Sequence, residues 1–185
     1  MTSTRTAKQP EPPAAAVAAD AHWAAKMERL RGRQLAETTF VICDDQDVRT
    51  RYQRAQRALE MAQTYVKDHP DDTEAAIQAA RASTEWDEAK SAYDGIAIPL
   101  VFRALPRKAL EQLYTEHKPS EAEADDGKEW DETFHAALIA ASSVDDMTEA
   151  DAQELLDTWS LSEANALFNA AYGVQNTTRA DLGKG

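Results

Sequence analysis

Residues 48–93, VRTRYQRAQRALEMAQTYVKDHPDDTEAAIQAARASTEWDEAKSAY, decide the fold of this chain because apolar residues recur there every three or four positions. The first half of the stretch places them at Val48, Tyr52, Ala55, Leu59, Ala62 and Val66. The second half places them at Ala75, Ala79, Ala82, Trp86, Ala89 and Tyr93. This heptad spacing predicts two helices that each present one apolar stripe. The segment 69–72, His-Pro-Asp-Asp, breaks the pattern and predicts the turn between them.

The two stripes match each other as the arms of an antiparallel hairpin. Facing positions in such a hairpin have residue numbers with a constant total, and here every pair, such as Tyr52 with Ala89, totals 141. A large side chain faces a small one in most layers, which favours close packing. We therefore predict a helical hairpin with arms of about 20 residues, or about 30 Å. The same register predicts two ion pairs, Arg54 with Glu88 and Arg57 with Glu85.

A short strand is predicted on each side of the hairpin. Residues 38–43, TTFVIC, are β-branched or aromatic, and Asp44 and Asp45 then end the strand and cap the first arm. Residues 96–102, IAIPLVF, form the second strand, and the hairpin register makes it antiparallel to the first. Pro99 then turns its missing donor away from the partner strand, so we predict a small two-stranded ribbon.

The region after the ribbon is predicted to form four helices. Pro106 suits the first turn of a helix that ends near Pro119, and residues 121–128 are interpreted as an acidic loop. Apolar residues at helical spacing then predict three further helices up to residue 176. Capping-box patterns mark helix starts at Asp71 with Glu74, Thr148 with Asp151 and Ser160 with Glu163.

These expectations give a mainly α fold in five parts. They are a disordered tail (1–20), a short helix and linker (21–37), the strand, hairpin and strand (38–104), a C-terminal helical domain (105–176) and a frayed tail (177–185). The short helix is expected to begin near Asp20 and to stop at about Gly32, because Trp23 and Leu30 follow helical spacing.

Charge is distributed unevenly along the chain. The formal net charge is -13, and residues 121–163 hold fourteen acidic residues against one base, Lys128. Such a field opposes binding to a phosphate backbone, so we expect no nucleic-acid partner. The acidic segment is interpreted either as solvated helix faces or as a surface that keeps an apolar partner soluble.

Several functional classes lack their motifs. The single cysteine, Cys43, excludes an internal disulfide or a multi-thiolate zinc site and is expected to be a buried small hydrophobe. Six scattered glycines do not form a phosphate loop, and the four histidines have no metal-ligand spacing. Apolar runs fall short of the roughly 20 residues that a membrane span requires. We therefore expect no enzyme activity, cofactor, metal or membrane contact.

One set of aromatic and leucine residues in the C-terminal region is the candidate partner-binding face. It comprises Trp130, Phe134, Leu138, Trp159, Leu167 and Phe168. The set is typical of a compact helical core, and it is also the only candidate for a groove that accepts a partner helix.

The order and spacing of several stretches resemble those of the tail assembly chaperones of long-tailed, siphovirus-type phages of actinobacteria. The stretches are 40–47 (FVICDDQD), 100–107 (LVFRALPR), 110–119 (LEQLYTEHKP), 134–146 (FHAALIAASSVDD) and 155–176 (LLDTWSLSEANALFNAAYGVQN). Where such proteins usually have Leu-Asp-Gly-Asp after the strand cysteine, this chain has Asp44-Asp45-Gln46-Asp47.

The resemblance implies a non-enzymatic protein that binds the tape measure protein, keeps it soluble and recruits the major tail protein. It also implies action in the host cytoplasm and absence from the mature virion, and it leaves self-association and a frameshifted longer form open. Two alternatives remain: a structural tail or head completion protein, and a host-directed protein-binding module.

Overall fold

The computed structural model describes residues 14–179, with side chains from residue 22 onward, and divides after Leu35 into two units. The first unit contains helix α1 (Ala14–Arg31). This helix begins six residues before the expected start at Asp20, because the alanine-rich segment that precedes Asp20 favours helix. Residues 1–13 of the expected tail, and 180–185 of the expected frayed end, lie outside the described residues.

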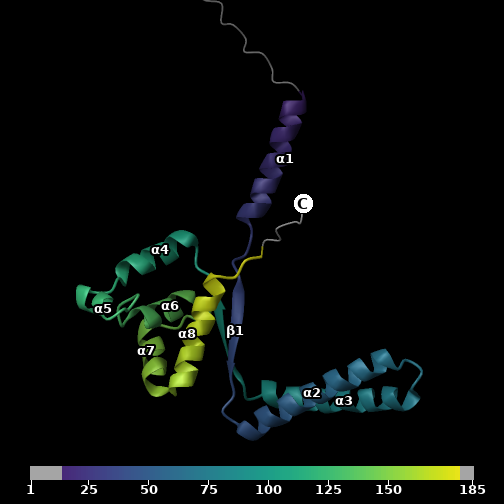
Figure 1. Ribbon diagram of the computed structural model, residues 1–185. Helices are drawn as coiled ribbons and strands as arrows, with labels where there is room; N and C mark the ends of the chain where they lie inside the picture. The colour runs from purple at the N-terminus through teal and green to yellow at the C-terminus, as the bar shows by residue number, and fades with distance from the viewer. Residues whose placement is uncertain (1–13, 180–185) are drawn as a thin grey trace, which may run out of the picture. The chain divides into compact units, whose positions relative to one another are not determined.

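The second unit confirms the predicted mainly α fold, with one small antiparallel sheet (Figure 1). Its elements are β1 (Glu37–Ile42), α2 (Gln46–Asp68), α3 (Thr73–Asp94), β2 (Ile98–Arg103), α4 (Arg107–Glu116), α5 (Glu121–Asp125), α6 (Phe134–Ser142), α7 (Glu149–Thr158) and α8 (Leu161–Gln175). Up to residue 179, the structure has five helices after β2 rather than four. The difference is α5, a short helix in the expected acidic loop, which a capping box between Ser120 and Glu123 starts.

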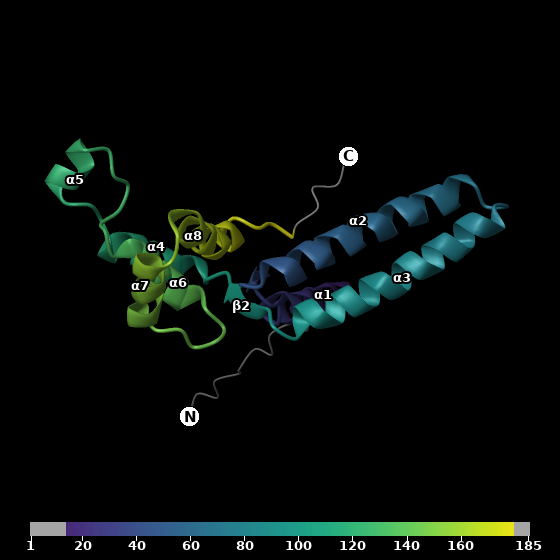
Figure 2. The ribbon, with the colours of Figure 1, turned by 90° about the horizontal axis from the view of Figure 1, so that it is seen from below.

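Helices α2 and α3 lie side by side and antiparallel (Figures 1 and 2). The residues of α2 that are not exposed are its stripe residues, Val48, Tyr52, Ala55, Leu59, Ala62 and Val66. The Tyr52 ring stacks on Tyr93 with centroids 4.3 Å apart and meets Trp86 at 4.8 Å. Tyr93 and Trp86 lie one helical turn after and one turn before Ala89 in α3, and Ala89 is 1% exposed. Tyr52 therefore faces Ala89. The two helices therefore pack through their apolar stripes.

The predicted ion pairs of the hairpin are wrong. Glu88 binds Arg51, at 3.2 Å, and not Arg54, and the structure gives no ion pair between Arg57 and Glu85. Arg57 lies midway between the stripe residues Ala55 and Leu59 in sequence, and this position points away from α3.

The N-cap of α2 is the predicted residue, whereas the N-cap of α3 is not. Asp45 caps α2 as predicted, since its carboxylate accepts hydrogen bonds from the N–H groups of Asp47 and Val48, both at 2.9 Å. Helix α3 is capped by Asp72, which accepts from Ala75 N–H at 3.0 Å, and not by Asp71. The turn is thus one residue longer than the capping-box pattern indicated.

Strands β1 and β2 form an antiparallel ribbon in which Thr39 faces Val101 and Val41 faces Pro99. Phe40, Leu100 and Phe102 point to one face of the ribbon and pack against the helices, whereas Thr39 and Val41 are exposed on the other face. The buried Cys43 follows β1 directly, as expected of a small hydrophobe.

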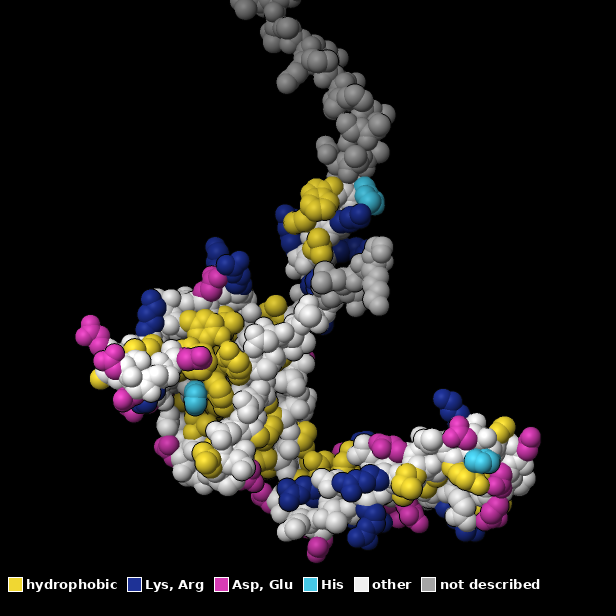
Figure 3. All heavy atoms as spheres, viewed as in Figure 1, with side chains coloured by type: hydrophobic (Ala, Val, Ile, Leu, Met, Phe, Trp, Pro, Cys, Tyr) yellow, Lys and Arg dark blue, Asp and Glu magenta, His cyan; other side chains and the backbone are white. Residues whose placement is uncertain are grey.

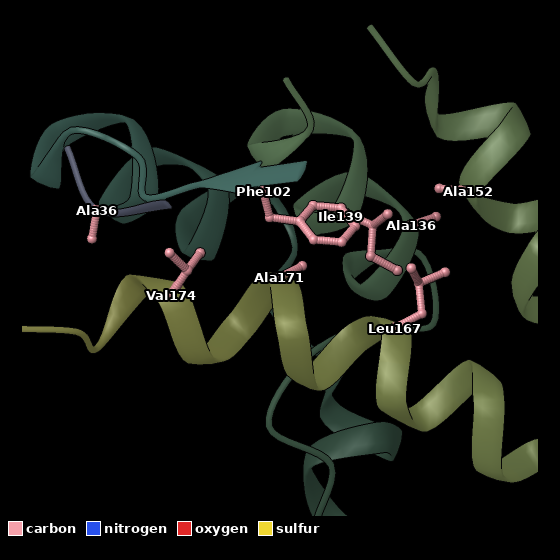
Figure 4. Close-up of a cluster of buried hydrophobic side chains, with 8 residues drawn as sticks. All are labelled: Ala36, Phe102, Ala136, Ile139, Ala152, Leu167, Ala171 and Val174. Carbon is pink, nitrogen blue, oxygen red and sulfur yellow. The ribbon is translucent and has the colours of Figure 1, made fainter. Parts of the chain in front are cut away.

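The hydrophobic core joins the ribbon to α6, α7 and α8. Figure 4 shows the Phe102 ring of β2 and the Ile139 side chain of α6 facing each other above Leu167 and Ala171 of α8. Each of these four residues is 0% exposed. The capping boxes at Thr148 and Ser160 are present and fix the starts of α7 and α8 against this core.

Candidate partner-binding surface

A cluster of aromatic rings covers one side of the C-terminal helices. Phe134 of α6 is fully buried at its centre, and the Trp130 ring stacks on it with centroids 4.4 Å apart. Tyr114 of α4 lies 5.5 Å from Phe134, and Phe168 of α8 lies 6.3 Å from it. Tyr172 closes the cluster at 5.8 Å from Trp130. We call these five residues the aromatic cluster; all except Phe134 are partly exposed.

Asp131 fixes the loop that carries Trp130. Its carboxylate accepts hydrogen bonds from Thr133 N–H at 2.9 Å and Phe134 N–H at 3.0 Å, which hold the start of α6, where the N-cap residue Thr133 has no side-chain cap of its own. His117 Nδ1 lies 3.3 Å from the same oxygen. Partial burial opposes ionisation of Asp131, but the hydrogen bonds from Thr133 and the contact with His117 outweigh it, so its pKa lies below the ordinary value.

A hollow of about 340 Å³ opens beside Trp130 and is lined by Lys128, Glu129, Trp130, Asp131, Glu132 and His135. The His135 ring stacks on Phe168 with centroids 3.9 Å apart. Desolvation lowers the pKa of His135, which keeps the ring neutral near pH 7. The lining residues therefore give the hollow an aromatic wall and an acidic rim.

Tyr114, which belongs to the aromatic cluster but does not line the hollow, has a raised pKa. Burial is the main cause, and the neighbouring Tyr172 is the second.

Such an arrangement suits a partner that offers both apolar and basic groups. An apolar side chain gains contact with the ring faces, and a Lys or Arg gains both the rim carboxylates and a cation–π contact with Trp130. Figure 3 shows hydrophobic side chains gathered over the region of α4, α6 and α8, with acidic side chains at its margin near α5.

The structure brings three of the six residues of the predicted face together in the aromatic cluster and places the other three outside it. Trp130, Phe134 and Phe168 belong to the aromatic cluster. Leu138 and Leu167 are 0% exposed, as is Phe134, so these three form the core and do not contact a partner directly. Trp159 lies elsewhere, stacked on Phe40 of β1 with centroids 6.4 Å apart.

Sequence reasoning missed Tyr114, His135 and Tyr172 as members of this surface. A signal was present for Tyr172, because it lies four residues after Phe168 in one helix and so shares a helical face with it, whereas Trp130 precedes α6 and contacts Phe134 from a loop. Tyr114 gives no such signal, since α4 meets α6 only through the tertiary fold.

Within the part of the chain that the structure describes, no group of three or more His, Cys, Asp or Glu residues could hold a metal ion. None of the described helices is long and apolar enough to cross a membrane. In comparisons with protein-family models, curated proteins and solved structures, no match to this chain was found.

Proposed function

We propose that this protein is a tail assembly chaperone of a long-tailed phage, which binds the tape measure protein, keeps it soluble and promotes assembly of the tail tube. The observation that carries the proposal is the partly exposed aromatic cluster with its acidic rim, in the same region as most of the resembling stretches. A tape measure protein is a long helical chain with apolar stripes that aggregate unless they are covered.

The net charge of -13 supports the same proposal. Many acidic copies bound along an apolar chain would repel one another and keep the complex in solution. The protein then acts without catalysis or a cofactor, in the host cytoplasm, recruits the major tail protein, and leaves before the virion is complete.

The proposal is tested by co-expressing the tape measure protein with the wild-type chain or with single variants. Trp130→Ala removes a wall of the hollow, and Glu132→Lys reverses one rim charge. We expect both to lower capture of the tape measure protein at least several-fold. Glu85→Lys is the matched control, because Glu85 is an exposed acid on α3 and the charge change is the same.

Circular dichroism of each variant separates lost binding from lost folding. Capture that stays at the wild-type level in both folded surface variants would contradict the proposed surface. Mass spectrometry of purified particles distinguishes the chaperone from a virion component, and a pull-down from uninfected cells exposes a host-directed partner.

A further inference from the structure

The two edges of the β ribbon differ in the state of their backbone groups. On the outer edge of β2, Val101 N–H donates to the Asp145 carboxylate at 2.9 Å, and Val101 C=O accepts from Val144 N–H at 2.8 Å. Pro99 lies two residues earlier on the same edge and has no N–H. The β2 edge therefore cannot take another strand.

The β1 edge is open. In an antiparallel pair, residues alternate between exchanging hydrogen bonds with the facing strand and pointing their backbone groups away from it. Val101 points away from β1, so Thr39, which faces it, points away from β2. Glu37 and Val41 follow the same alternation. Among residues 14–179, the structure gives the outward N–H and C=O groups of these three residues no hydrogen-bond partner.

Natural sheets usually protect such an edge with proline, lysine, a bulge or a covering element. Strand β1 has the sequence ETTFVI, with no proline or lysine, and its one charged residue, Glu37, is paired with Arg103 of the neighbouring strand. Its register with β2 is continuous from Glu37 to Ile42, without a bulge. An unprotected edge of this kind is a template for a further strand.

We propose that the β1 edge binds the β1 edge of a second copy of this chain, antiparallel and about a two-fold axis at Thr39. Thr39 of one copy then faces Thr39 of the other, and Glu37 faces Val41. The outward donors and acceptors of these three residues are all paired in this register, and the product is a four-stranded sheet in the order β2-β1-β1-β2.

Charge and side-chain type are complementary in this register. Glu37 is already held by Arg103 of its own chain at 2.7 Å, and it meets an uncharged Val41 across the axis. No like charges face each other along the shared edge. A threonine pair at the axis is a favourable cross-strand contact. On the core face, Phe40 lies beside Thr38 of the other copy.

The helices on the ribbon also fit a pair of copies. Helix α8 packs on both β1 and β2, so the two α8 helices would lie two strand spacings apart, roughly 10 Å, which is an ordinary distance between packed helices. Glu163 is the only charged residue in α8. A stable interface typically buries at least ~1,200 Å², which is more than the pairing of two short strands buries. Contact between the two α8 helices would supply the additional buried area.

The assembly closes on itself. Pairing uses the open edge of each copy and leaves only the β2 edges, which Pro99 and the Asp145 contact block. A two-fold contact of this kind yields a dimer and not a fibre. Because each copy carries a net charge of -13, association strengthens as salt screens the repulsion.

The test is sedimentation equilibrium on the purified full-length chain, with Thr39→Glu and Thr39→Lys measured separately and mixed. Thr39 is exposed, so both variants should keep the wild-type circular dichroism. We expect the wild type to approach twice the chain mass of 20.4 kDa at high concentration and each variant alone to dissociate at least ~10-fold more readily. The equimolar mixture should recover the dimer, because opposite charges then meet at the axis.

Each other result overturns the proposal. A wild type that stays monomeric at about 100 µM in moderate salt leaves the edge to a different occupant. A folded variant that dimerises as well as the wild type places the contact elsewhere. Failure of the mixture to recover the dimer contradicts the register. The measurement needs no phage partner, so it stands apart from the proposed function.

Discussion

Asp131 shows how a single polar residue can organise an apolar surface. Its carboxylate accepts from Thr133 N–H and Phe134 N–H at the start of α6, and its own N–H donates to His117 C=O at 3.1 Å. The loop that carries Trp130 is thus held at both the α4 and the α6 ends. A hydrogen bond inside a folded chain contributes a net ~1 kcal/mol to stability.

We expect Asp131→Ala to lower the free energy of unfolding by about 1–2 kcal/mol, because Thr133 N–H loses its acceptor and Phe134 N–H keeps only its longer bond, at 3.4 Å, to the backbone C=O of residue 131. Chemical denaturation followed by tryptophan fluorescence measures the change. The matched control is Asp87→Ala, at an exposed acid of α3 whose carboxylate has no hydrogen-bond partner among the described residues. Equal stability of the two variants would contradict the stabilising role of the Asp131 hydrogen bonds.

The lowered pKa of His135 predicts that the folded chain loses stability on mild acidification. Its pKa in the folded chain lies below the unfolded value of about 6.5, so the unfolded state binds the proton more readily. The contribution of the neutral ring is full above about pH 6.5 and is lost as the pH falls below that value. We expect His135→Asn to show a smaller loss of melting temperature than the wild type between pH 7 and pH 5.

The carboxylates of the capping boxes predict a second loss of stability, at a lower pH than that of His135. Hydrogen bonds from Ser120 lower the pKa of Glu123, and those from Thr148 lower the pKa of Asp151. Their contributions to the stability of the folded state are present above the unfolded pKa values of about 4 and are lost as the pH falls through the folded pKa values.

The outcome that would contradict the His135 prediction is a His135→Asn variant whose melting temperature changes between pH 7 and pH 5 as much as that of the wild type.

At the scale of elements, the helical hairpin is the part that sequence determines most directly. Its register follows from local periodicity, because every layer is set by the same two stripes. The ion pairs failed because they depend on side-chain direction around the helix and not on the numbering of facing layers. The aromatic cluster was predicted only in part, since Tyr114, Trp130, Phe134 and Phe168 come from separate segments that meet through the fold.

The tight layer at Ala89 gives a prediction for the hairpin. Ala89→Leu forces a larger side chain into the space beside Tyr52, and we expect a loss of about 1–3 kcal/mol in the free energy of unfolding. Ala92→Leu, at an exposed position of the same helix, is the control and should be nearly neutral. Urea titration measures both. A loss no larger than that of the control would contradict the packing described.

At the scale of the whole molecule, the hairpin is an insertion between the two strands. Among the described elements, α2 and α3 contact each other and no other helix or strand, whereas α4, α6, α7 and α8 form a continuous network with the ribbon. Stability of the C-terminal core should therefore not depend on the hairpin.

This modularity is tested by replacing residues 43–97 with Asn-Gly. Ile42 and Ile98 face each other at the end of the ribbon, and a two-residue turn of this sequence joins such strands. We expect the shortened chain to keep the near-ultraviolet circular dichroism of Trp130 and Trp159 and a cooperative melt. Loss of both signals would show that the hairpin is needed for the core to fold.

The proposed chaperone function is tested most directly by the soluble yield of the tape measure protein expressed with and without this chain. We expect the tape measure protein to be largely insoluble alone, to become soluble with the wild-type chain, and to co-purify with several copies of it. A tape measure protein whose solubility is unchanged by the chain, with no complex recovered, would contradict the proposed function.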